Sequence, residues 1–339
     1  MSEGSPASPL AGEMLRALED DLRASAERVA GEGYGRVREM IGYHLGWTDS
    51  GSGRGKRIRP LLTLLACAGA GGRWRDALPA ASSVELIHNF SLVHDDIQDR
   101  SQSRRGRPTL WKRWGIAQAL NTGDTIFVLA RLAAGRLLEN GVRVEDSLAV
   151  QRTLDEACLA LTLGQHLDLA FEDEPNVSEE MYLEMIAGKT AALLEAACQV
   201  GARLGGASEA ARDAYRRFGR HLGLAFQILD DALGVWGEPG VTGKSAGDDL
   251  AARKKSFPVV FGLAHSPEFA RRWAAASNDP SDLQAMAQAL RAAGADERAH
   301  ALAQRHTDEA LSALEEAAPA GQAGAELRAL SLRLLQRRH

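Results

Sequence analysis

The sequence predicts an all-α protein, a single-domain bundle of ten or more helices around a central cavity. Apolar residues recur at the three- and four-residue spacing of amphipathic helices along most of the chain. The breaks between these stretches carry glycine, proline, asparagine and aspartate, which favour turns. Alternation of apolar and polar residues with a period of two is nowhere long enough to predict a sheet.

The order of the elements follows from this spacing. Residues 1–9 are small and polar, so we expect them to be disordered and the domain to span 10–339. Helices are predicted over 10–30 and 37–45, and the glycine-rich stretch 49–55, which leads into the basic segment 55–60, is expected to be a flexible loop. Further helices are expected over 61–70, 76–101, 113–139, 144–172, 178–205, 207–235, 248–264, 267–276, 281–293, 296–316 and 321–337. Those beyond about 265 have a weaker apolar pattern and are expected to form a peripheral cap.

Composition narrows the class of protein. The chain has 339 residues, 45% of them apolar, and a net charge of −5 from 40 basic and 45 acidic residues. This balance argues against a nucleic-acid or anionic-membrane binder. The cysteines, Cys67, Cys158 and Cys198, lie in Ala/Leu-rich stretches without metal-ligand spacing, which indicates a reducing compartment. We find no run of 18 apolar residues and no secretory signal, so we expect a cytoplasmic protein without stable membrane insertion.

The helix predicted over 76–101 carries three aspartates near its C-terminal end, Asp95, Asp96 and Asp99. Spacings of three and four residues return to the same helix face, so these carboxylates are expected to share one patch. Their mutual repulsion requires a compensating cation, and ligands that are all oxygen atoms suit Mg²⁺. The simpler alternative is a solvated acidic turn at a helix end.

A polar stripe runs along one face of this otherwise apolar helix: His88, Ser91, Asp95 and Asp99. Such a stripe indicates a wet cavity rather than bulk solvent. A second stripe lies in the helix predicted over 207–235 and consists of Gln227, Asp230 and Asp231. Two helices of this kind facing each other across a bundle would line a pocket with carboxylates, which is how metal sites are built in bundles.

Basic residues gather mostly at loops and helix ends: Lys56, Arg57 and Arg59; Arg104, Arg105 and Arg107; Lys244 and Lys254. Each cluster alone is typical of a solvated surface. Loop and helix ends also offer backbone N–H groups, and lysine and arginine bind phosphate, so anionic and cationic clusters together favour a metal-bound diphosphate. Lys189 is different, because it lies in a very apolar helix and there needs an anionic partner or a route to the surface.

These motifs, in this order, resemble those of the trans-isoprenyl diphosphate synthases, the polyprenyl synthetases. The resemblance spans about 55–260 and rests on six segments: 55–60, 95–99, 104–109, 164–169, 189–190 and 226–231. It implies the isoprenoid synthase type of helical bundle and a homodimer. It also implies a Mg²⁺-dependent prenyltransferase that lengthens an allylic diphosphate by condensing it with isopentenyl diphosphate.

The resemblance further implies a role for each matching residue. The metal ligands would be Asp95, Asp99 and Asp230, supported by Asp96 and Asp231. The allylic diphosphate would be bound by Arg104, Lys189, Lys244 and Lys254, and isopentenyl diphosphate by Lys56, Arg59, His88 and Arg105, with Arg57 beside them. Catalysis would use these aspartates, Lys189, and the dipoles of the Thr190 hydroxyl and the Gln227 amide, which would face a transient carbocation.

Two positions bear on the details of the reaction. The family's second motif has an aspartate four residues after Asp230, where this chain has Gly234, and the remaining aspartates are expected to keep metal binding. The product should grow along the helix before Asp95, where Ser91 and Phe90 lie about 6–7.5 Å below that carboxylate. In the family that these motifs resemble, a single aromatic at this level goes with C15–C20 products, so the resemblance implies such a product, and we favour C20. The alternative for Phe90 is plain core packing.

Three other functions compete with this interpretation. A terpene cyclase or head-to-head synthase on the same fold would not need the expected isopentenyl-binding residues Lys56, Arg59 and Arg105. A non-catalytic regulatory subunit of a prenyl synthase would be expected to lose aspartates from the first motif, and all three are present. A helical scaffold with incidental charge leaves the order of the motifs unexplained.

Overall fold

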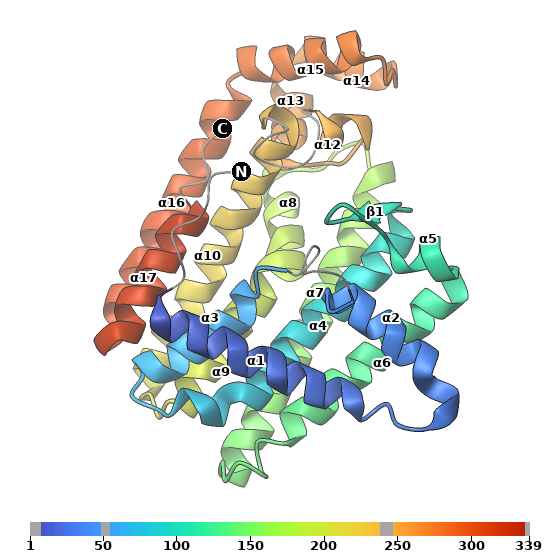
Figure 1. The fold of residues 1–339 in the computed structure, drawn as a ribbon. Helices are drawn as coiled ribbons and strands as arrows, with labels where there is room; N and C mark the ends of the chain where they lie inside the picture. The colour runs from blue at the N-terminus through green and yellow to red at the C-terminus, as the bar shows by residue number, and fades with distance from the viewer. Residues whose placement is uncertain (1–7, 49–54, 238–246, 336–339) are drawn as a thin grey trace.

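The computed structural model describes residues 8–48, 55–237 and 247–335, and these parts form a helical bundle with one short hairpin (Figure 1). The predicted all-α class with more than ten helices is confirmed. The helices are α1 (Pro9–Glu27), α2 (Gly35–Leu45), α3 (Ile58–Gly69), α4 (Leu78–Gln98), α5 (Leu110–Trp114), α6 (Ile116–Gly135), α7 (Val144–Asp173), α8 (Glu179–Ile186), α9 (Ala192–Leu204), α10 (Glu209–Trp236), α12 (Asp248–Ala251), α13 (Phe257–His265), α14 (Pro267–Ala274), α15 (Pro280–Ala292), α16 (Ala295–Ala317) and α17 (Gly321–Leu335).

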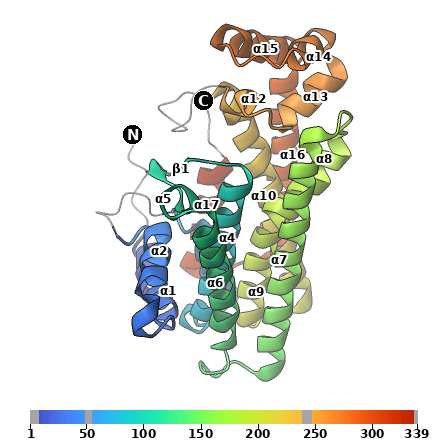
Figure 2. The same ribbon diagram turned by 90° about the vertical axis from the view of Figure 1, so that its right-hand side faces the viewer.

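Helix α4 lies at the centre of the bundle and packs against α1, α3, α6, α7 and α9. Figure 2 shows that α4, α6, α7 and α10 run along the long dimension of the molecule. Because α4 is covered on most sides, its first three turns are almost entirely buried. Its C-terminal end, which carries the aspartates, is therefore the part of the helix that can meet a ligand.

Helices α1 and α3 begin earlier than the sequence predicts, for reasons that lie in their first turns. The Ser8 hydroxyl accepts a hydrogen bond from the Ala11 N–H, and Pro9 occupies the first turn of α1, so these two residues are ordered. The expected disorder of residues 1–7 lies outside the described part of the chain. Helix α3 begins at Ile58 rather than 61, because Arg57 adopts a left-handed conformation (φ 49°) and Pro60 is tolerated in a first helical turn.

The predicted peripheral cap is confirmed only for α14 and α15, which lie across one end of the bundle (Figure 1). Helix α16 instead packs along α10, and α17 packs against α3. Their residues Ala310, Leu314 and Leu327 belong to the main core. The weak apolar pattern of these helices reflects alanine, which contributes little area itself but lets helices approach closely.

Short irregular elements interrupt the predicted pattern in several places. They are the 3₁₀ turns η1 (Glu32–Tyr34) and η2 (Trp74–Ala77), the π-helical turn η3 (Ala187–Ala191), and the strands β1 (Ser103–Arg104) and β2 (Arg107–Pro108). The strands pair antiparallel around Arg105 and Gly106, both with positive φ, as a type I′ hairpin turn requires. Two-residue strands are too short to show an alternating pattern. Among the described residues, no helix is long and apolar enough to cross a membrane.

Candidate active site

The first aspartate motif lies at the C-terminal end of α4, where Asp99 caps the helix. The negative end of the helix dipole makes this an unfavourable place for three carboxylates unless cations are close. Asp96 is buried, whereas Asp95 and Asp99 are only partly covered. The predicted clustering of the three on one helix end is thus present, with Asp95 and Asp99 the more accessible pair.

Cationic side chains from three other segments bond to these aspartates. Arg104, in the hairpin, donates from Nε to Asp96 Oδ1 at 2.8 Å and from a terminal nitrogen to Asp95 Oδ2 at 3.1 Å. Lys189 Nζ lies 3.5 Å from Asp95 Oδ1, and Lys254 Nζ lies 2.9 Å from Asp99 Oδ2. The fold therefore brings three of the residues expected to bind diphosphate onto the end of α4.

These contacts set the protonation of the motif. Burial alone would raise the pKa of Asp95, but Lys189 and Arg104 outweigh it and lower that pKa. Burial dominates at Asp96 and raises its pKa to about 6, although Arg104 opposes the shift. Asp95 is therefore held as a carboxylate near neutral pH by cations that a bound ligand could replace.

Lys189 is anchored by a second carboxylate that sequence reasoning did not assign to the site. Its ammonium donates to Asp168 Oδ2 of α7 at 2.5 Å. A Cβ on Gly164 would lie 2.7 Å from the Gly188 carbonyl carbon, so glycine is needed where α7 meets η3. The sequence signal was available, because Asp168 lies in the segment 164–169, but nothing in its spacing pointed to Lys189.

The second aspartate motif on α10 divides into an exposed and a buried residue. Asp230 is exposed, whereas Asp231 is buried and accepts three hydrogen bonds. The donors are the Tyr182 hydroxyl at 2.7 Å, the Gln227 amide at 2.7 Å and the Phe257 N–H at 2.9 Å. Burial and then Asp249 raise the pKa of Asp231 to about 7, against the effect of the donors. Through these contacts Asp231 joins α10 to α8 and to the start of α13, a structural role that the expected metal role did not include.

Gln227 links the two polar residues expected to face a carbocation. Its carbonyl oxygen accepts from the Thr190 hydroxyl at 2.7 Å, while its amide nitrogen donates to Asp231. The side-chain orientation of Gln227 is thereby determined by partners on both sides. A continuous chain of hydrogen bonds runs from η3 through α10 to Tyr182 of α8.

A second basic group lies about two turns before Asp95 on the same face of α4, around His88. Arg59 and His88 approach each other with 3.4 Å between a guanidinium nitrogen and Nε2, and Arg59 Nε is buried without a hydrogen-bond partner. Burial, followed by the charge of Arg59, places the pKa of His88 well below its usual value, so the imidazole is neutral. The Arg105 guanidinium lies against Gly55, where a Cβ would be 2.7 Å from one of its nitrogens. An unpaired donor and several cations are suited to an anionic ligand.

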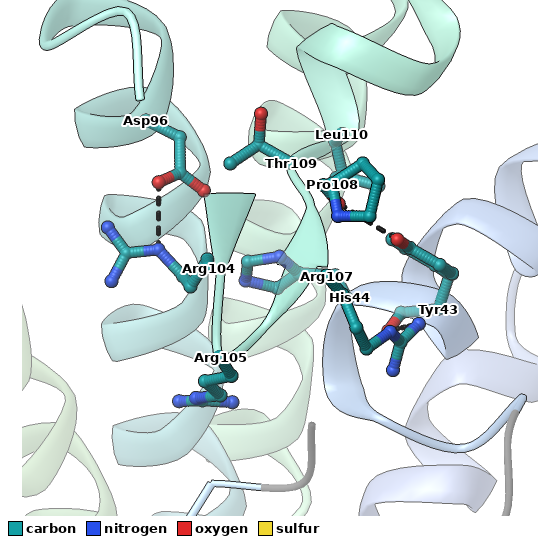
Figure 3. Close-up of a pocket in the computed structure, with 9 residues that line it drawn as sticks. All are labelled: Tyr43, His44, Asp96, Arg104, Arg105, Arg107, Pro108, Thr109 and Leu110. Atoms are coloured by element: carbon teal, nitrogen blue, oxygen red, sulfur yellow. Dashed lines mark hydrogen bonds and ion pairs between the residues drawn. The ribbon is translucent and has the colours of Figure 1, made fainter. Parts of the chain in front are cut away.

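The hairpin closes this region with a small pocket. Figure 3 shows Asp96 and Arg104 facing each other on one side and Tyr43 against Pro108 on the other. The lining residues are Tyr43, His44, Asp96, Arg104, Arg105, Arg107, Pro108, Thr109 and Leu110. His44 Nε2 is buried without a partner here. The pocket adds His44 to the residues that sequence reasoning missed, since α2 gave no polar stripe.

Arg57 does not lie among these binding residues, contrary to the expectation. It is 4% exposed and donates to Glu19 Oε1, Glu85 Oε1 and the Leu45 carbonyl oxygen, each at 2.8 Å. Its side chain ties the start of α3 to α1, α2 and α4. Lys56 beside it is exposed, and Lys244 lies outside the described residues.

The residues expected to control product length lie on the buried part of α4. Phe90 is 6% exposed and packs against Phe127 of α6, with ring centroids 5.1 Å apart, and against His94 at 5.7 Å. Ser91 is partly covered, and its hydroxyl donates to the His88 carbonyl oxygen at 2.8 Å. Phe90 therefore belongs to the packed core.

Within the described ranges, no three carboxylate, imidazole or thiol groups come close enough together to hold one metal ion. The aspartates are paired with lysine and arginine instead. A metal would bind by exchanging these partners rather than by entering a preformed cage.

Comparison with known proteins decides the family. Residues 48–293 match the family model described as polyprenyl synthetase. The chain belongs to the polyprenyl synthetase family. This family is the one that the order of the motifs predicted, so a helical scaffold with incidental charge is excluded.

Relatives of this polyprenyl synthetase extend over nearly its whole length. The (2E,6E)-farnesyl diphosphate synthase of Mycobacterium tuberculosis is 40% identical over 97% of the chain and 93% of the relative. The geranylgeranyl diphosphate synthase of the same organism is also 40% identical, over 95% and 94%. Since the two relatives have different products at equal identity, product length must be argued from particular residues.

A solved structure connects the fold to ligands. The geranylgeranyl pyrophosphate synthase of Corynebacterium glutamicum, complexed with isoprenyl diphosphate and magnesium, has a TM-score of 0.85 and 28% identity. The match covers 98% of this polyprenyl synthetase and 100% of that chain. The whole fold, and not only the motif-bearing part, is therefore shared with a family member that binds both ligands.

Proposed function

We propose that this polyprenyl synthetase is a chain-elongating prenyltransferase, with residues 10–339 as a single domain. It condenses isopentenyl diphosphate with an allylic diphosphate to an all-trans product of C15–C20, with C20 favoured. The observation that carries the proposal is the set of cations from β1, η3 and the segment after α12 that meet the aspartates at the end of α4. The product names of the relatives support the same reaction class.

The residues present fit Mg²⁺. The donor set is carboxylate oxygen throughout, and Asp95 and Asp99 already bond to positively charged groups in this structure. Asp95, Asp99 and Asp230 would hold the ion, with Asp96 and Asp231 as positioning residues because both are buried and bonded to other side chains. When bound, Mg²⁺ supplies stabilisation of negative charge on the departing diphosphate.

The cations then serve the substrates. Arg104, Lys189 and Lys254 would exchange an aspartate for the oxygens of the allylic diphosphate, and Lys244 is proposed from its motif alone. Exchange of one anionic partner for another avoids leaving a buried charge unpaired. Nearer the middle of α4, around His88, Arg59, His88, Arg105 and Lys56 would bind isopentenyl diphosphate, helped by the unpaired Arg59 Nε.

The hydrogen-bonded pair of Thr190 and Gln227 would stabilise the allylic carbocation. The Thr190 hydroxyl donates a hydrogen bond to Gln227 Oε1, so the lone pairs of the hydroxyl oxygen remain available to a positive charge. Because Gln227 is held by Asp231, these dipoles need no reorganisation when the charge develops.

A homodimer is proposed from an apolar surface on the neighbouring helices α6 and α7. Ile116, Leu120, Val128 and Leu132 repeat at intervals of four or eight residues along α6, and each is 42 to 58% exposed. Leu148, Leu159 and Leu163 of α7 are at least 55% exposed. Such a surface would be covered by a second copy, and sedimentation analysis would show a dimer. The buried free cysteines agree with a cytoplasmic location.

The deciding experiment is incubation with isopentenyl diphosphate, Mg²⁺ and dimethylallyl, geranyl or farnesyl diphosphate in turn, followed by measurement of product length. Elongation to C15 or C20 supports the proposal. Failure to elongate any of the three primers would refute it. Release of diphosphate from an allylic substrate without isopentenyl diphosphate would indicate the cyclase alternative instead.

A further inference from the structure

The position that departs from the family's second aspartate motif is not an empty space. Gly234 lies four residues after Asp230 on α10, so it is one turn further along the same helix face. A Cβ on Gly234 would lie 2.5 Å from Asp249 Cγ and would collide with one oxygen of that carboxylate. The carboxylate of Asp249, from α12, thus occupies the space that a side chain at 234 would take.

This arrangement explains why the helix keeps a glycine at a buried position. Glycine in a helix interior is destabilising relative to alanine. Here alanine would require Asp249 to move. Gly234 and Asp249 are therefore a complementary pair, in which the absence of one side chain makes room for the other.

Asp249 also lines the cavity that contains Lys189 and Lys254, two of the residues proposed to bind the allylic diphosphate. That cavity is lined by Asp168, Lys189, Gln227, Asp231, Asp249 and Lys254, among others. The Lys254 N–H donates to the Asp249 carbonyl oxygen at 3.0 Å, and the Lys254 ammonium bonds to Asp99. The backbone around Asp249 is thereby tied, through Lys254, to the first aspartate motif.

We infer that Asp249 completes the second aspartate motif from outside it, providing on the metal-binding side of the site the carboxylate that Gly234 lacks. The inference rests on the proposed function. The motif is thus split between two helices, with Asp230 on α10 and the further carboxylate on α12. Metal binding would then stabilise the docking of α12 against α10 as well as the diphosphate.

The first test measures metal binding without turnover. Mn²⁺ is titrated by electron paramagnetic resonance into the full chain with inorganic diphosphate present, for the wild type and the isosteric variant Asp249→Asn. We expect at least tenfold weaker binding, or loss of one bound ion. Asp282→Asn, which removes the same charge from α15 outside this cavity, should bind as the wild type does. Unchanged Mn²⁺ binding by Asp249→Asn would overturn the inference.

The second test exchanges the two residues. Gly234→Asp alone should lower the melting temperature, and the double variant Gly234→Asp/Asp249→Gly should regain both stability and Mn²⁺ binding. Wild-type stability of Gly234→Asp would show that the space is not shared and would overturn the pairing. If wild-type protein elongates no primer, the proposed function fails; if it does elongate while Asp249→Asn binds Mn²⁺ normally, only this inference fails.

Discussion

Replacement of Arg57 by methionine separates a structural role from a substrate-binding one. Methionine keeps much of the length of the side chain but removes three hydrogen bonds, each 2.8 Å long, to Glu19, Glu85 and the Leu45 carbonyl oxygen. The Arg57 and Glu85 side chains are 2% and 3% exposed, so the Glu85 carboxylate would lose its charged partner away from water.

The size of the effect follows from what remains around Glu85. Breaking a buried ion pair by removing one partner costs about 3–5 kcal/mol. The Asn89 amide still donates to Glu85 Oε1 at 2.8 Å, and Glu19 is more accessible at 12% exposed, so both losses are partly compensated. We therefore expect the lower end, about 3 kcal/mol of unfolding free energy. With a urea dependence of about 3 kcal/mol per molar, the midpoint moves down by about 1 M.

The measurement is urea unfolding followed by circular dichroism, with steady-state kinetics of the folded variant. Lys56→Met, at the exposed neighbour, should change the stability by less than about 0.5 kcal/mol. Arg57→Lys should be intermediate, because one ammonium cannot reach three acceptors arranged around a guanidinium. A stability loss below about 1 kcal/mol in Arg57→Met, combined with a raised KM for isopentenyl diphosphate, would refute this reasoning and return Arg57 to the binding set.

Three further predictions concern product length, pH and packing. Phe90→Ala removes the ring that packs on Phe127 and should lengthen the product by at least one isoprene unit; unchanged length in a chromatographic assay would reduce Phe90 to core packing. Burial, followed by the charges of Arg104 and Arg105, lowers the pKa of His44 to about 3, so the unfolded state binds more protons below pH 6.5 and stability falls as the pH is lowered. This contribution of His44 amounts to at most about 2 kcal/mol at pH 5. Between pH 7 and pH 5, urea unfolding should therefore show that the wild type loses up to about 2 kcal/mol more stability than His44→Asn, and equal losses would contradict the reasoning. Gly164→Ala should lower the free energy of unfolding by about 1–3 kcal/mol, because the added methyl group pushes α7 away from η3. Gly135→Ala, at a position with open space around it, should leave the stability unchanged or raise it. Equal melting temperatures of the two variants would contradict the close contact at Gly164.

The helices and the two aspartate motifs could be predicted because both depend on spacing within one segment. Periodic apolar residues indicate a helix without reference to its neighbours, and Asp95 and Asp99 share a face wherever α4 packs. The pairing of these aspartates with Arg104, Lys189 and Lys254 depends on how distant segments meet. Such contacts leave no mark in the spacing of residues along the chain.

The differing fates of Arg57 and Arg59 illustrate the same limit. The two residues are separated by one position in one basic segment, but Arg57 adopts a left-handed conformation and enters the core while Arg59 reaches His88. Both residues are arginines, so residue type does not distinguish these outcomes. They differ because Arg57 meets acidic partners, Glu19 of α1 and Glu85 of α4. Asp168 and Asp249 were missed for a related reason, since each matters through a neighbour far away in the chain.

The π-helical turn η3 has a consequence for the rotational phase of the chain. Residues 179–204 run as helix throughout, yet the widened turn carries an extra residue and so shifts α9 relative to α8. As a result Tyr182 and Met185 pack with Phe257, while Leu193 and Cys198 beyond the turn belong to the main core. Lys189 lies within the π-helical turn itself, between the two helical segments. Deleting one residue there would rotate one half against the other by about 100°, so that the two apolar faces could no longer both find their neighbours.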